Sequence, residues 1–158
     1  MRIGVLSDTH GFFDPQLCTR FAGVAHIVHC GDIGHADVIE RLRSLAPVSA
    51  VLGNVDLPHL RGAFPEELQL ELGGVRCFVR HQGMAPQELT SEFEQQLRKA
   101  GVRVFAFGHS HRPLVGEHGG VLFFNPGSAG RKRFHLPRTA GLLHLEGATV
   151  RAEIVPLE

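Results

Sequence analysis

The first third of the chain alternates between short apolar runs and segments typical of helices. Residues 2–7, 25–30 and 47–52 are mostly apolar runs that predict strands, and the first is apolar enough to be buried on both faces. Between them, residues 15–22 predict a short helix that begins with a proline, and residues 35–46 carry apolar side chains at helical spacing. Strands that alternate with helices in this way predict a parallel sheet with right-handed crossovers.

The pattern changes in the middle of the chain. Residues 55–65 show no periodicity and predict a loop at a functional site. Residues 67–72 alternate strictly between polar and apolar positions, and Gly73-Gly74 separates them from the apolar residues 75–79. This arrangement predicts a β-hairpin whose first strand is half exposed. Residues 85–100 predict a helix.

The last third of the chain is predicted to consist mainly of strands. Residues 102–107 form an apolar run that ends at a glycine. Further strands are expected over residues 114–117, 121–124, 140–145 and 150–155. The complete pattern predicts a single α/β domain over residues 1–158.

The composition narrows the class of protein. Hydrophobic residues make up 43% of the chain and charged residues 20%, as in ordinary globular proteins, and 16 Lys and Arg balance 16 Asp and Glu. The balance argues against a protein that tracks along nucleic acid, which needs a basic face. The three cysteines are isolated, so we expect reduced thiols and a cytoplasmic protein. No run approaches the ~20 apolar residues of a membrane span, so no membrane contact is expected.

Polar side chains follow the ends of five predicted strands. In open α/β sheets, sites form where the carboxyl ends of strands meet. Each residue alone is more often a capping aspartate or a core histidine, but their joint placement predicts a metal site. If strand geometry continued past Gly108, His109 and His111 would point to the same side. The candidate ligands are Asp8, His10, Asp32, Asn54, His81, His109 and His111.

Seven candidate ligands are too many for one ion of ordinary coordination, and they predict two ions that share a carboxylate. Carboxylate, amide and imidazole ligands without a thiolate are typical of Mn²⁺, Fe, Zn²⁺ or Ni²⁺, and we expect Mn²⁺ first. Two such ions, ~3.5–4 Å apart, can bind a phosphoryl group and generate hydroxide from a bridging water. The chemistry expected here is therefore hydrolysis of a phosphoester.

The order of these residues resembles the motifs of the calcineurin-like metallophosphoesterase superfamily. The matching motifs are D-x-H at Asp8, G-D at Asp32, G-N-x-D at Asn54, a histidine at His81 and G-H-x-H at His109. The short chain and the G-N-x-D form are similar to the small bacterial and archaeal phosphodiesterase branch, which also includes a retromer subunit. The resemblance spans residues 2–155 and implies a four-layer α/β/β/α sandwich of two mixed β-sheets.

The resemblance also implies a role for each candidate ligand. Asp32 would bridge the two ions, and we expect Asp32, Asn54 and His109 to take part in catalysis. The first ion would be held by Asp8, His10 and His111, and the second by Asn54, His81 and His109. The motif at 125–128 resembles a superfamily segment with a supporting role.

Two departures from the superfamily pattern bear on the substrate and the second ion. In the branches that hydrolyse monoesters, a histidine that is thought to assist the leaving group follows Gly-Asn, whereas this chain has Val55. The next acidic residue, Asp56, is expected to anchor its loop. General acid assistance is typically worth ~10²–10⁴-fold, so its loss favours phosphodiesters with good leaving groups. In addition, Gln82 separates His81 from Gly83 where the superfamily has His-Gly, which predicts a slightly altered second ion site.

The expected function is hydrolysis of small or nucleotide phosphodiesters. A phosphomonoesterase acting on small molecules is one alternative, and a binding scaffold without turnover, like the retromer subunit, is another. Retention of all seven ligands argues against the scaffold. The basic cluster Arg131, Lys132 and Arg133 is either a solvated face or a contact for substrate phosphate. The physiological substrate and the oligomeric state, a homo-oligomer included, stay open.

Overall fold

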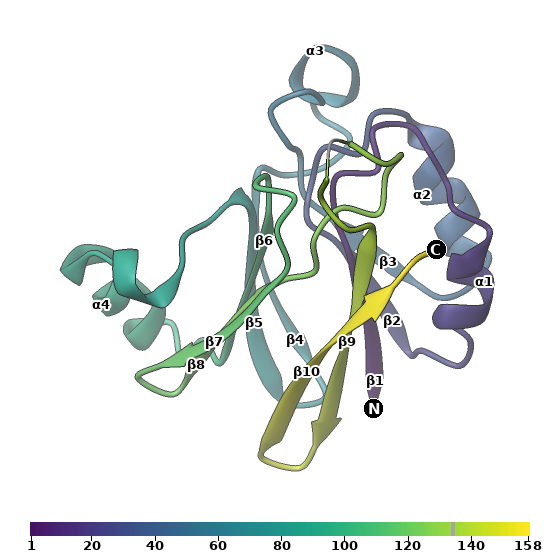
Figure 1. Ribbon diagram of the computed structural model, residues 1–158. Coiled ribbons are helices and arrows are strands. Elements are labelled where there is room, and N and C mark those ends of the chain that lie inside the picture. Colours follow the sequence, from purple (N-terminus) through teal and green to yellow (C-terminus); the bar gives the residue numbers. More distant parts are fainter. Residues whose placement is uncertain (134) are drawn as a thin grey trace.

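The computed structural model describes residues 1–133 and 135–158, and it consists of two β-sheets packed face to face (Figure 1). The first sheet has the strand order β10-β9-β1-β2-β3, and the second has the order β4-β5-β6-β8-β7. The strands of the first sheet are β1 (Arg2–Leu6), β2 (His26–His29), β3 (Val48–Ala50), β9 (Thr139–Glu146) and β10 (Thr149–Pro156). Those of the second are β4 (Glu67–Leu72), β5 (Val75–Gln82), β6 (Val104–Gly108), β7 (Leu114–His118) and β8 (Val121–Asn125).

Helices cover the outer face of each sheet. Leu17 of α1 (Gln16–Arg20) and Leu42 of α2 (Ala36–Arg43) pack against the first sheet. Phe93 of α4 (Ser91–Lys99) packs against the second sheet on the opposite side of the molecule, as Figure 1 shows. The predicted four-layer α/β/β/α sandwich is therefore confirmed. Among the described residues, no helix is long and apolar enough to cross a membrane.

The two sheets share a dry core. Val5 and Val28 of the first sheet pack against Val79 and Val104 of the second, and all four side chains are almost fully buried. Leu6, the next residue after Val5, points to the opposite face and joins the core beneath the helices. The apolar run at the start of the chain is explained by this burial on both faces of β1, because side chains alternate between the faces of a strand.

Parallel pairing brings the carboxyl ends of the central strands to one edge. β1, β2 and β3 are parallel in the first sheet, and β5, β6 and β8 are parallel in the second. Both sets of strands end at the upper edge of the sandwich in Figure 1, where the connecting loops gather. Side chains that follow strands far apart in the sequence therefore meet at this edge.

Two predicted elements differ from the structure. The segment 55–65 contains a short helix, α3 (Leu57–Leu60), which has no apolar periodicity because none of its residues is buried. The helix expected over 85–100 is divided into a 3₁₀ turn, η1 (Pro86–Glu88), and α4. The division occurs because Thr90 is extended and caps α4, its Oγ1 accepting a hydrogen bond from the Phe93 N–H at 3.2 Å.

Candidate metal centre

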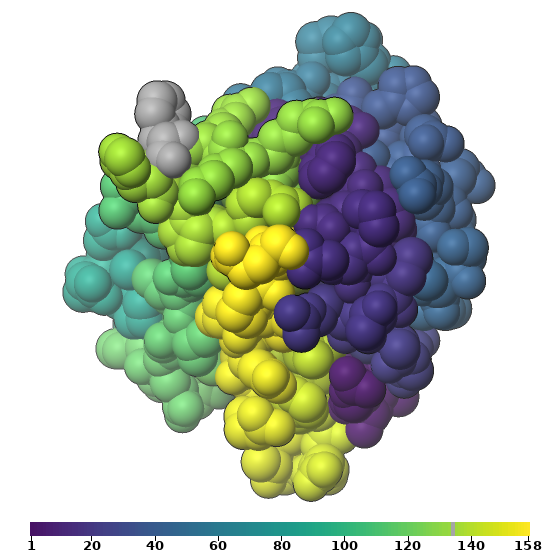
Figure 2. Space-filling view, turned by 45° about the vertical axis from the view of Figure 1, so that its right-hand side comes forward, coloured from purple at the N-terminus to yellow at the C-terminus, as the bar shows by residue number. Residues whose placement is uncertain are grey.

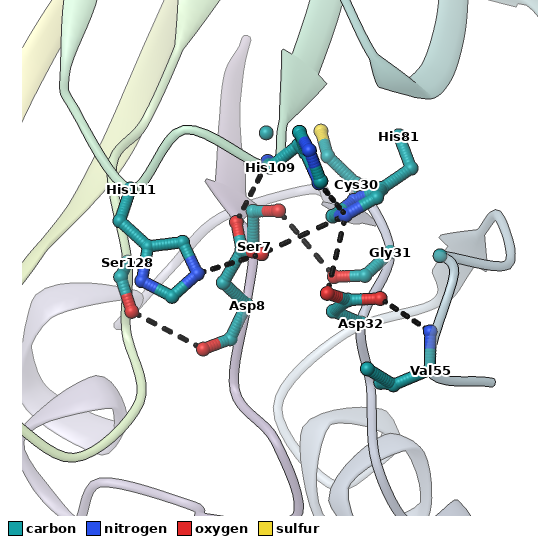
Figure 3. A network of polar contacts seen from close by, with 12 residues as sticks. Ser7, Asp8, Cys30, Gly31, Asp32, Val55, His81, His109, His111 and Ser128 are labelled. Atoms are coloured by element: carbon teal, nitrogen blue, oxygen red, sulfur yellow. Dashed lines mark hydrogen bonds and ion pairs between the residues drawn. The ribbon is translucent and has the colours of Figure 1, made fainter.

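Six of the seven candidate ligands converge at the shared edge of the two sheets (Figure 3). They form two groups, and within each group the ligand atoms lie within 4.8 Å of one another. Asn54, which follows β3, lines the same cleft as His81. The first group contains Asp8, His10 and His111, and the second contains Asp32, His81 and His109.

Five of these ligands have a left-handed backbone. They are the only non-glycine residues with positive φ in the described part of the chain, with φ values of 56° for Asp8, 47° for His10, 54° for Asp32, 73° for His109 and 61° for His111. Each such residue costs of order 1–3 kcal/mol and persists only where its surroundings enforce it. Strand geometry therefore stops at Gly108, so the condition for a same-side arrangement is not met, and His109 and His111 join the two different groups that the resemblance implied.

Backbone hydrogen bonds hold the loops after β1 and β2 against each other. The N–H groups of Asp8 and His10 donate to the carbonyl oxygens of Gly31 and Asp32, both at 3.0 Å. Because each loop fixes the backbone of the other, the first and second ligand groups are positioned as one unit.

The buried pair Thr9 and His29 joins the same two loops from beneath. His29 Nδ1 accepts the Gly31 N–H at 3.2 Å, so its Nε2 carries the proton and donates to Thr9 Oγ1 at 2.9 Å. The Thr9 hydroxyl donates in turn to the Ile33 carbonyl at 2.9 Å. Burial lowers the pKa of His29 to about 3, so this imidazole is neutral. The sequence analysis did not identify this pair, although a histidine two residues before Gly31-Asp32 in an apolar strand was an available signal.

Each aspartate uses one oxygen for the backbone and directs the other at imidazoles. Asp8 Oδ2 accepts the His109 N–H at 3.1 Å, and its Oδ1 lies 3.2 Å from His111 Nε2. Asp32 Oδ1 accepts the Val55 N–H at 3.0 Å. The other oxygen, Asp32 Oδ2, lies 3.2 Å from His81 Nε2 and 3.8 Å from His10 Nε2. Asp32 Oδ2 thus lies between the two groups.

Unpaired lone pairs in the centre fit a bound cation. Asp8 Oδ1 and His10 Nε2 are buried and have no hydrogen-bond partner among the described residues, which is costly unless another group satisfies them. Burial and the positive charge of Arg133 lower the pKa of His10, and together they outweigh the negative charges of Asp32 and Asp8, which raise it. A neutral imidazole nitrogen and a carboxylate oxygen are both lone-pair donors, and divalent transition metals bind such sets.

His81 is oriented in the way that metal-binding histidines usually are. Its Nδ1 lies 2.8 Å from the Cys30 carbonyl, which can only accept, so Nδ1 carries a proton. The Nε2 atom therefore faces Asp32 Oδ2 and lies 3.3 Å from His109 Nδ1. Burial opposes the charged form, but the hydrogen bond to Asp32 and the charge of Asp8 outweigh it and raise the pKa of His81.

The extra residue Gln82 does not displace His81. The register between β5 and β6 shifts between Val79 and Gln82, which is the signature of a β-bulge. The bulge takes up the inserted residue, and His81 stays buried within the second group.

Asp56 is an anchor of the loop after β3. Its carboxylate accepts three backbone N–H groups, those of Ile33, Gly34 and Gly53, all at 2.9 Å. Gly53 is required here because a Cβ atom would lie 2.1 Å from Asp32 Oδ1. The expectation that Asp56 holds its loop therefore agrees with these contacts.

The motif at 125–128 supports both ligand-bearing segments. Asn125 Nδ2 donates to the Gly108 carbonyl at 3.1 Å, and the Ser128 hydroxyl donates to the Asp8 carbonyl at 3.2 Å. These contacts tie the G-H-x-H turn and the loop after β1 to one neighbouring segment, in line with the supporting role that the sequence implied.

The chain is similar to a group of known proteins. Residues 1–148 match the model of the calcineurin-like phosphoesterase superfamily domain. A probable metallophosphoesterase of Methanothermobacter thermautotrophicus is 31% identical over 160 residues, which cover 98% of this chain and 92% of the relative. A protein of Methanocaldococcus jannaschii named a phosphodiesterase is 26% identical, with coverage of 98% and 99%. The structure of Vps29 from Entamoeba histolytica complexed with zinc has a TM-score of 0.75 at 22% identity, covers 99% of both chains and shows likeness of fold alone.

Metal content tests the two-group arrangement. Protein saturated with Mn²⁺ or Zn²⁺ and then desalted should hold about two ions per chain by elemental analysis. The substitution His10→Ala should remove about one ion, whereas His144→Ala, at a surface histidine paired with Glu153, should remove none. Saturation at a single ion in the unsubstituted protein would contradict the shared centre.

The buried pair beneath the loops can be tested through stability. Thr9→Val should lower the free energy of unfolding of the metal-free protein by about 1–3 kcal/mol, because the buried His29 Nε2–H loses its acceptor, whereas the Ile33 carbonyl keeps the Gly11 N–H at 2.7 Å. Ser49→Ala is the matched control, since it removes the hydroxyl that is hydrogen-bonded to the half-buried His26. It should lower the free energy of unfolding by clearly less. Urea unfolding measures both, and equal losses would show that the Thr9 contact has no special weight.

Proposed function

Because the chain belongs to the calcineurin-like phosphoesterase superfamily, we propose that it is a metal-dependent phosphodiesterase that hydrolyses small or nucleotide phosphodiesters. The relative named a phosphodiesterase supports this choice within the superfamily. The unpaired atoms Asp8 Oδ1 and His10 Nε2 support metal dependence, since burying them without a partner is unfavourable.

In this proposal, the two ligand groups would hold two divalent ions, with Mn²⁺ as the first expectation. When bound, such ions stabilise negative charge on phosphoryl oxygens and activate water. Asp32, whose Oδ2 faces histidines of both groups, would be the carboxylate that the two groups share. The backbone N–H of His109 fixes the Asp8 carboxylate, and the Cys30 carbonyl fixes the ring of His81. Asn54 completes the second group from the loop after β3.

The absence of a proton donor after Asn54 is the observation that carries the choice of a diester. Val55 is 37% exposed at this position and has no proton to give. Asp56, the next residue, is 1% exposed and accepts three backbone N–H groups, so its carboxylate is held away from a leaving group. Substrates that need no protonation of the leaving group lose least. A diester also carries one charge fewer than a monoester dianion, so an attacking hydroxide is repelled less.

The cleft beside the second group offers room for an ester substituent. Its volume is about 460 Å³, and Asn54 and His81 lie on its wall together with Leu52, Leu57 and Gln82. A leaving group that occupies this cleft would therefore contact both apolar and polar side chains.

A binding scaffold is the alternative from another class. The Vps29 neighbour shares the fold, and at 22% identity it supports nothing further. Turnover separates the two functions, because a scaffold needs no hydrolysis of any ester.

The substrate preference gives the first functional test. Protein reconstituted with Mn²⁺ should hydrolyse bis(4-nitrophenyl) phosphate with a kcat/KM at least about tenfold above that for 4-nitrophenyl phosphate, because no general acid assists the monoester. Asp32→Ala should abolish both activities. Equal or better kcat/KM on the monoester would sink the diesterase proposal.

Restoring a donor gives the second functional test. Val55→His should lower the diester-to-monoester ratio of kcat/KM by about tenfold or more, since an imidazole can protonate the leaving group. Val55→Gln is the matched control, because it adds a polar side chain without a useful acid and should keep the ratio. His59→Ala should also keep the ratio. If His59→Ala selectively loses monoester turnover, His59 of α3 is the proton donor, and the preference for diesters does not result from Val55.

A further inference from the structure

A second cleft borders the loop after β1 and is basic. It has a volume of about 400 Å³, and the residues that matter on its wall are Phe12, Arg131, Lys132 and Arg138. Figure 2 shows the light-green segment that carries the basic residues next to the purple N-terminal part of the chain and above the yellow C-terminal residues. Phe12 follows the candidate ligand His10 by two residues, so one wall of the cleft belongs to the loop that carries this ligand.

The basic segment is docked directly on the backbone of Asp8. The Ala129 N–H donates to the Ser7 carbonyl at 2.9 Å. The approach of Gly130 is so close that a Cβ atom there would lie 2.5 Å from the Asp8 carbonyl oxygen. The next residues, Arg131 and Lys132, are exposed. The backbone from which these two side chains extend is therefore held against the loop that carries Asp8.

The cations of this cleft are not equivalent. Arg138 forms an ion pair with the buried Asp14 and donates from Nε to the Gly130 carbonyl at 2.7 Å, so its charge is already neutralised within the wall of the cleft. In contrast, Arg131 and Lys132 have no ion pair among the described residues, and the carboxylate of Glu158 is the only one among the described lining residues. The guanidinium carbon of Arg131 lies 4.5 Å from the centroid of the Phe12 ring. Stacking on an aromatic ring restricts the orientation of this guanidinium group and leaves its N–H groups available to donate hydrogen bonds.

The cleft near the second ligand group has the opposite character. Glu66 and Glu67 are exposed on its wall, and Arg80 lies 3.8 Å from Glu67 Oε1, whereas Glu66 has no ion pair within residues 1–133 and 135–158. A negatively charged substituent is therefore disfavoured on this side and favoured beside Phe12. The two clefts together give an asymmetric substrate a preferred orientation.

We propose that the Phe12 cleft is a subsite for a second phosphate group, carried on one substituent of the phosphodiester, with Arg131 and Lys132 as its contacts. This inference rests on the proposed function. An arginine fork matches the oxygens of a phosphate in a bidentate arrangement, and a lysine adds a second positive charge. The ring of Phe12 orients the fork. The substrate class is then a phosphodiester with an additional phosphate on the substituent that extends past His10.

A matched pair of esters tests the subsite through turnover. The probes are thymidine 5′-(4-nitrophenyl phosphate) and the same compound with a 3′-phosphate, so both release the same leaving group. The added phosphate should raise kcat/KM about tenfold in the unsubstituted protein, as a charged hydrogen bond of this kind provides. In the double variant Arg131→Met with Lys132→Met, the ratio between the two esters should fall to about one.

The control for charge is the other lysine of the chain. Lys99→Met removes an exposed lysine from the end of α4, on the far side of the second sheet, and should keep the ratio of the unsubstituted protein. Equal hydrolysis of the two esters by the unsubstituted protein would overturn the subsite and leave the diesterase proposal intact.

A binding measurement separates the subsite from the proposed activity. Calorimetric titration of metal-free protein in a chelator with thymidine 3′,5′-bisphosphate should give a Kd about tenfold higher for the double variant than for the unsubstituted protein and Lys99→Met. If neither ester is hydrolysed, the proposed function fails while this difference still supports the subsite. A Kd that is the same in all three proteins would overturn it.

Discussion

The burial of two carboxylates at one point is the constraint on which the site depends. Asp8 is 0% exposed and Asp32 is 3% exposed, and each directs one oxygen towards Nε2 of His81. Buried like charges destabilise a protein unless cations or hydrogen bonds compensate them. Backbone N–H groups of His109 and Val55 compensate one oxygen of each, and the remaining oxygens need positive charge. A bound divalent cation would supply this charge.

The rest of the fold places this charge where a substrate can reach it. Parallel strands in two sheets bring the ligand-bearing strand ends to one edge, and left-handed turns follow β1, β2 and β6 where their ligands begin. The strain of these turns is distributed over loops that hold one another through Thr9, His29 and Asp56. The large dry core between and beneath the sheets supplies the stability that such strain requires.

The sequence predicted those features that depend on local pattern. Apolar runs located the strands, and residues at strand ends located six converging ligands, because sheet geometry converts sequence order into spatial proximity. It did not predict α3, which is exposed and has no apolar face, or the extended Thr90 that divides the helix expected over 85–100. The His29 contact to Thr9 depends on the relative placement of two strands, which periodicity does not encode. The different directions of His109 and His111 depend on positive φ, which periodicity does not encode either.

Anomalous diffraction from crystals grown with Mn²⁺ would locate the metal ions at this edge. Two peaks ~3.5–4 Å apart are expected, with the Asp32 carboxylate in contact with both. Asp8, His10 and His111 should surround one peak, and Asn54, His81 and His109 the other. A single peak, or two peaks that share no contact with Asp32, would contradict the account.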